Sequence, residues 1–199
     1  MRKSDCRNAI NKLYVGEILI LLTVFSSLSV LDSVHEIFSL FGLFALCGLV
    51  GVVFQVIGII KVRKINNTFN NAFLCFLLQA ILWVGCAILS ALDSNEADWI
   101  KICLNSIEVA ISSFGIYTTY YVICGCGELI NKKKGTNFGK GTKITYSIMM
   151  ILIIVLQIIE FFNIPESILL IIELITMVLE IVSYFMYVVL LGKTVKKLN

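Results

Sequence analysis

Six long runs of apolar residues, each bounded by charged residues, dominate this chain of 199 residues. About 20 apolar residues are enough for a helix to cross the hydrocarbon core of a bilayer. The runs cover residues 13–31, 37–60, 69–92, 99–124, 144–162 and 165–191. Because backbone polar groups in lipid must be paired within the protein, these runs predict an all-α integral membrane protein with six transmembrane helices.

The composition supports a membrane protein without a soluble domain. Apolar residues make up 59% of the chain and charged residues 15%, against about 25% charged residues in a soluble domain. The runs leave only short tails and loops, so we expect a single polytopic membrane domain over residues 1–199. The first run is longer than the apolar part of a secretory signal, and no clear cleavage site follows it, so we interpret it as a span.

The placement of lysine and arginine predicts the orientation. Cytoplasmic loops of membrane proteins carry an excess of these residues. If the chain crosses the bilayer six times, 15 of its 16 basic residues lie on one side, and only Lys101 lies on the other. Short acidic turns occupy that other side, around residues 32–36, 93–98 and 166. We therefore expect both termini to be cytoplasmic.

The same landmarks divide the chain into three tandem helical hairpins. Each unit has an apolar helix, an acidic outer turn, a second apolar helix and a basic inner end, and the units cover residues 7–65, 66–137 and 138–199. A shift of 65 residues aligns the ends of the second and third units and brings Glu108 onto Glu173. The residues between them match poorly, so a shared topology without duplication explains the pattern equally well.

Polar residues recur at helical spacing inside the fourth and sixth runs, and ionisable groups at membrane depth usually have a function. From these two faces we predict an interior site that binds a substrate or a cation. Its candidate residues are Glu108, Ser112, Thr119, Tyr120, Tyr121, Glu173, Thr176, Glu180, Ser183 and Tyr187.

The glutamates decide the chemistry that we expect at this site. Glu173 and Glu180 are seven residues apart, which is about 10.5 Å along a helix. Two carboxylates this close in a low dielectric repel each other, so one is expected to bind a proton or to have a cation nearby. In the alternative interpretation, neutral Glu, Ser, Thr and Tyr side chains only form hydrogen bonds between helices.

The polar and small residues also suggest which spans face the interior. Gly48, Gly51, Gln55 and Gly58 form a stripe in the second run, where backbones can approach closely. We expect the second, fourth and sixth spans to turn inward and the aliphatic first and fifth spans to face lipid. Glu17, near the cytoplasmic boundary of the first span, is expected to reach the headgroups by snorkelling.

Sequence motifs exclude several classes of protein. The basic residues are distributed in small clusters, which does not favour binding of nucleic acid. The seven cysteines lack the spacing of a disulfide framework, and Cys124 with Cys126 is too small a set for a thiolate metal site. We expect no metal and no cofactor. The motifs of common enzyme families are absent, so enzymatic activity is not expected.

Two functions are favoured over a third, a membrane-embedded enzyme that uses a carboxylate or a thiol, because no pair of nucleophile and base can be placed from the sequence. The first is binding or transport of a small solute, proton or cation through the interior site. The second is a non-transporting scaffold or accessory subunit that contacts a partner membrane protein or a second copy of the chain. Size and topology resemble the vitamin-binding subunits of energy-coupling-factor transporters, although no motif of that family is present. The abundance of Ile, Lys and Asn suggests a bacterial plasma membrane protein.

Overall fold

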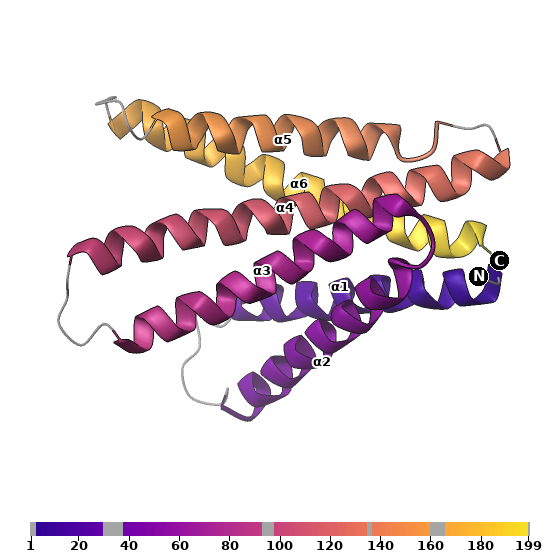
Figure 1. Cartoon of the computed structure of the whole chain (residues 1–199), viewed down its shortest axis with the longest axis horizontal. Coiled ribbons are helices and arrows are strands. Elements are labelled where there is room, and N and C mark those ends of the chain that lie inside the picture. Colours follow the sequence, from indigo (N-terminus) through magenta and orange to yellow (C-terminus); the bar gives the residue numbers. More distant parts are fainter. Residues whose placement is uncertain (1–2, 30–37, 93–97, 135–136, 160–165, 199) are drawn as a thin grey trace.

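The structure, a computed structural model, describes residues 3–29, 38–92, 98–134, 137–159 and 166–198, which form six helices (Figure 1). The helices are α1 (Lys3–Ser29), α2 (Phe38–Val62), α3 (Asn67–Leu92), α4 (Asp98–Lys134), α5 (Lys140–Ile159) and α6 (Glu166–Lys197). No strand occurs within these ranges. The prediction of an all-α chain is confirmed.

Several helices are longer than the apolar runs from which they were predicted. α1 begins at Lys3, ten residues before its apolar run, and α4 continues ten residues beyond its run to Lys134. α6 likewise continues to Lys197. The apolar runs were ended at charged residues, but Lys, Arg and Glu are good helix formers, so a helix that leaves the apolar region has no reason to stop there.

Three described segments are long and apolar enough to cross a membrane by length and composition: Asn67–Ala91, Ile102–Asn131 and Leu170–Lys197. A shorter apolar helix covers Leu46–Val62. These segments indicate that the chain associates with a membrane. Crossing by all six helices stays a prediction.

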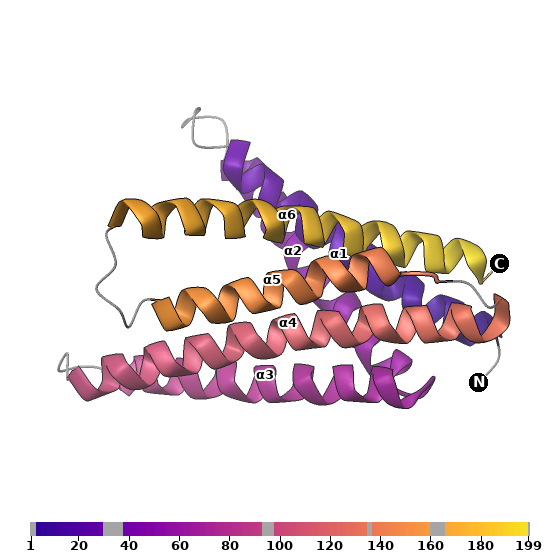
Figure 2. The ribbon, with the colours of Figure 1, turned by 90° about the horizontal axis from the view of Figure 1, so that it is seen from above.

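Both ends of the chain lie at the same end of the molecule (Figures 1 and 2). The connections from α2 to α3 and from α4 to α5 lie there as well. We call this end the basic end. Its described basic residues include Arg7, Lys12, Lys61, Arg63, Lys64, Lys140, Lys143, Lys193, Lys196 and Lys197. Of the predicted acidic turns, residues 32–36 and 93–97 lie outside the described residues, whereas Asp98 and Glu166 are the first residues of α4 and α6.

The hydrophobic core is concentrated toward the basic end. All six helices contribute buried side chains to it, including Ile10, Ile59, Phe69, Ile123, Tyr146 and Leu191. Farther from the basic end, large apolar side chains such as Val84, Ile102 and Leu170 are exposed. Exposed apolar side chains over this much of a helix bundle are expected where lipid surrounds it.

α1 does not face outward, so the prediction that the first span faces lipid is wrong. α1 packs extensively against α2 and also contacts α6. A methyl group added at Gly16 would lie 2.8 Å from the carbonyl oxygen of Gly51, so the two backbones touch. The predicted close approach along the glycine stripe of α2 is thereby confirmed, and the partner of this stripe is α1.

Candidate functional site

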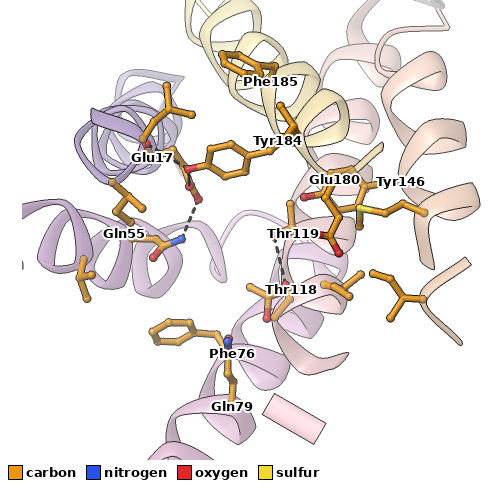
Figure 3. A pocket seen from close by; sticks show the side chains of 18 of the residues that line it. Glu17, Gln55, Phe76, Gln79, Thr118, Thr119, Tyr146, Glu180, Tyr184 and Phe185 are labelled. Atoms are coloured by element: carbon orange, nitrogen blue, oxygen red, sulfur yellow. Dashed lines mark hydrogen bonds between the residues drawn. The ribbon is translucent and has the colours of Figure 1, made fainter. Parts of the chain in front are cut away.

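A cavity of about 920 Å³ lies between the helices, beyond the core at the basic end (Figure 3). Every helix contributes to its wall. The lining residues are Glu17, Ile20, Leu21, Val52, Gln55, Phe76, Gln79, Ala80, Trp83, Gly115, Ile116, Thr118, Thr119, Tyr146, Met149, Ile153, Glu180, Ile181, Tyr184 and Phe185. Most of the wall is apolar or aromatic, with polar groups at a few places, which is the usual character of a small-molecule pocket.

The Glu17 carboxyl is the centre of a hydrogen-bond network at one side of this cavity. The Gln55 Nε2 group donates to Glu17 Oε1 at 2.8 Å, and the Tyr184 hydroxyl donates to Glu17 Oε2 at 2.8 Å. The Tyr187 hydroxyl donates to Glu17 Oε1 at 3.3 Å. The donors come from α2 and α6, so this one carboxyl connects three helices.

The burial of Glu17 overturns the expectation that it snorkels to the headgroups. Its side chain is only 3% exposed. Because α1 continues to Lys3 and lies between α2 and α6, Glu17 is surrounded by protein on several sides. A carboxyl group is costly to bury unless its oxygens are hydrogen-bonded, and the three donors satisfy that requirement.

Glu180 is the second carboxyl of the cavity, and its surroundings differ from those of Glu17. It is exposed, and none of the described residues donates a hydrogen bond to it. It lies one helical turn before Tyr184, and in the view of Figure 3 the Tyr184 ring lies between Glu17 and Glu180. Thr119 and Tyr146 also line the wall.

The α3–α4 side of the cavity carries an uncharged polar group. The Gln79 side chain lies against Gly115, and a methyl group added at Gly115 would be 2.9 Å from Gln79 Nε2. Gly115 thus leaves space for the Gln79 amide. Gln79 brings α3 into the polar part of the cavity wall.

The described side chains among the residues predicted for the site fall into three groups. Thr119 and Glu180 line the cavity. On α6, Thr176, Ser183 and Tyr187 are buried, and only Tyr187 reaches the network. The remaining described residues do not line the cavity: Glu108, Ser112, Tyr120 and Tyr121. The side chain of Glu173 lies outside the described residues.

Glu108 and Ser112 lie on the predicted face of α4, but farther from the basic end than the cavity. Both are exposed, whereas Gly115 and Thr119 on the same face line the cavity. The spacing identified the correct face of the helix. It could not identify how far along that face the other helices enclose a space.

Tyr120 lies nearer the basic end than the cavity does, and its ring faces the Lys143 ammonium group. The Nζ atom of Lys143 is 5.7 Å from the centre of the Tyr120 ring. The neighbouring Cys124 and Tyr120 side chains raise the pKa of Lys143, because their deprotonated forms would attract its positive charge. In the described part of the chain, no group of three or more His, Cys, Asp or Glu side chains is placed to hold a metal ion.

Sequence reasoning missed Glu17, Gln55 and Tyr184 as members of one site. Two signals were present. Gln55 is the only large polar residue in the glycine stripe of α2, and Tyr184 follows Glu180 at a spacing of four. The third residue, Glu17, was assigned to the headgroup region because it lies near the cytoplasmic boundary of the first span, close in sequence to the charged residues before it.

Comparison with known proteins gives no relative: no family model fits the sequence, and no curated protein and no solved structure matches it significantly. The fold and the cavity are therefore the only basis for a functional argument.

Proposed function

We propose that this chain is a multi-pass membrane protein that binds and transports a small solute or cation through the cavity between its six helices. The observation that carries the proposal is the pair Glu17 and Glu180, two carboxyl groups from different helices in one cavity of about 920 Å³. Pockets for small ligands usually have volumes of about 300–1,000 Å³. Carboxyl groups at membrane depth are costly and are typical of ion and substrate pathways.

The proposal includes six membrane crossings with both termini in the cytoplasm of a bacterial cell. Support for this orientation comes from the basic end, where both termini and two of the connections lie together (Figure 1). An excess of Lys and Arg is typical of the cytoplasmic side of a membrane protein. In this orientation, Glu17 and its donors lie on the cytoplasmic side of the cavity.

The alternative function, a non-transporting scaffold, depends on surfaces that are free to bind a partner. The glycine stripe of α2 was the clearest candidate for such a surface. Because Gly51 packs on Gly16 of the same chain, that stripe is already covered by α1. This removes the strongest reason for the scaffold.

The test is the melting temperature of the purified protein between pH 5 and pH 8, with a panel of cations and small solutes. A ligand that binds only the folded state raises the apparent stability. The variants are Glu17→Gln and Glu180→Gln, with Glu128→Gln as a matched control. Glu128 is an exposed glutamate that also accepts side-chain hydrogen bonds, but it lies at the basic end and away from the cavity.

We expect at least one solute or pH change to stabilise the wild type, and we expect Glu17→Gln or Glu180→Gln to lose that response while Glu128→Gln keeps it. Uptake of the stabilising solute into proteoliposomes then tests transport. If the wild type and all three variants respond alike to every condition, the cavity is not a binding site and the scaffold function replaces the proposal.

A further inference from the structure

The lining of the cavity limits the charge of a ligand. Glu17 and Glu180 are its only ionisable groups besides the two tyrosines, and no described Lys, Arg or His lines it. The other polar side chains, such as Gln55, Gln79 and Thr119, are uncharged. An anion would meet two carboxyl groups and no positive charge, so the electrostatics of the cavity disfavour anions.

The two carboxyl groups have unequal hydrogen bonding, which indicates where a cation would bind. Glu17 already accepts hydrogen bonds from Gln55, Tyr184 and Tyr187. Glu180 faces the cavity and accepts none from the described residues. Glu180 is therefore the group that a cationic ligand would pair with directly, because the oxygens of Glu17 are already occupied by hydrogen bonds from the protein.

The aromatic residues favour an organic cation over a metal ion. Five of the lining residues have aromatic rings: Phe76, Trp83, Tyr146, Tyr184 and Phe185. A cation is attracted to the face of such a ring, and quaternary ammonium ligands are recognised by groups of aromatic rings. A bare Ca²⁺ or Mg²⁺ ion needs six or more oxygen ligands, and the described residues do not gather even three suitable carboxylate, thiol or imidazole groups.

The rest of the wall is apolar and favours a ligand that has apolar groups around its cationic centre. Ile20, Val52, Met149, Ile153 and Ile181 line the cavity together with the aromatic rings. A small hydrated cation would leave this surface without a partner, whereas apolar rings attached to the cationic centre would bury it.

Resting on the proposed solute-binding function, we propose that the ligand is an amphipathic organic cation, with its positive centre beside Glu180 and its apolar groups against the aromatic wall. The volume of the cavity is sufficient for a cation that carries several rings.

A pair of probes with the same shape and opposite charge tests this inference. Tetraphenylphosphonium and tetraphenylborate both carry four phenyl rings around one central atom, and they differ in the sign of the charge. Binding of each to the detergent-purified protein is measured by titration calorimetry, with protein-free micelles as the background. The variants are Glu180→Gln, Trp83→Leu and the control Glu128→Gln. Glu180 and Trp83 are both exposed, so neither substitution removes a side chain from the core.

We expect the wild type to bind tetraphenylphosphonium at least tenfold more tightly than tetraphenylborate. Glu180→Gln is expected to weaken binding of the phosphonium about tenfold, Trp83→Leu severalfold, and Glu128→Gln not at all. If both probes bind equally, or the borate binds better, the preference for cations is overturned and the solute-binding function stands. If neither probe binds but another solute stabilises the protein, the inference of an organic cation is overturned and the solute-binding function stands. If no solute binds, both proposals fail.

Discussion

The Gln55 amide of α2 donates a hydrogen bond of 2.8 Å to the Glu17 carboxyl of α1, and this contact lies beside the place where the backbones of the two helices touch. On the other side of the carboxyl, Tyr184 and Tyr187 donate from α6. The residues that meet here are up to 170 positions apart in the sequence. The first and last helices are thus joined through one acidic side chain, which also forms part of the cavity wall.

Replacement of Glu17 by Ala is expected to destabilise the protein. The substitution removes the carboxyl that accepts from Gln55, Tyr184 and Tyr187, and it leaves Tyr184 only its longer hydrogen bond, of 3.3 Å, to the backbone carbonyl of residue 17. Hydrogen bonds between membrane helices contribute about 0.6 kcal/mol each on average, so loss of three predicts a cost of roughly 2 kcal/mol. The free energy of unfolding is measured by denaturation in mixed micelles.

Glu128→Ala is the matched control for this experiment. Glu128 accepts hydrogen bonds from Asn66 at 3.1 Å and Thr68 at 2.7 Å, but it is exposed at the basic end, where water can replace it. We expect its removal to cost much less than removal of Glu17. Equal costs for the two variants would mean that the burial of Glu17 has no energetic importance.

Gly16→Ala is expected to force α1 and α2 apart. The new methyl group would lie 2.8 Å from Gly51 O and 2.9 Å from Gln55 N, and both of these are backbone atoms that cannot turn aside. Gly85→Ala on α3 is the control, because nothing lies within 4 Å of the added carbon. We predict a clearly lower melting temperature for Gly16→Ala and an unchanged or slightly higher one for Gly85→Ala, since Ala favours helix over Gly. Similar melting temperatures would contradict the close contact.

Periodicity predicted the helices and the small-residue face of α2, because both follow from local sequence. It did not predict the partner of that face, since Gly16 is a single glycine in a helix whose first half is charged. The prediction that Glu17 reaches the headgroups was wrong for a related reason. Depth was judged from the nearest charged residues, whereas burial depends on which helices lie on either side of α1, and one sequence does not fix that packing.

The same limit applies to the α4 face. Helical spacing placed Glu108, Ser112 and Thr119 in line, and the structure supports this alignment. Only Thr119 lines the cavity, because the other helices surround α4 at that level and not at Glu108. Sequence spacing therefore identified a face, and tertiary packing selected one segment of it.

Gly115→Ala is predicted to alter ligand size selection without unfolding the protein. The added methyl group would lie 2.9 Å from Gln79 Nε2, at the mobile end of a side chain, so the amide can shift at low cost. Its shift reduces the space beside Gly115. We expect a melting temperature near that of the wild type, severalfold weaker binding of tetraphenylphosphonium and unchanged binding of tetramethylammonium. If binding of both ligands is weakened equally, the substitution has changed the charge or the folding of the protein and not the size of its cavity.

Reporter fusions test the predicted orientation of the basic end. Green fluorescent protein folds in the cytoplasm, and alkaline phosphatase becomes active only after export, so the two reporters give opposite signals on the two sides of a bacterial membrane. We expect a fusion after Asn199 to be fluorescent and to lack phosphatase activity. A fusion within residues 93–97 should give the reverse result, because the end of α3 and the beginning of α4, which this segment joins, lie opposite the basic end (Figure 1). If both fusions report the same side, the six-span topology is wrong, and the Glu17 side of the cavity cannot be assigned to the cytoplasm.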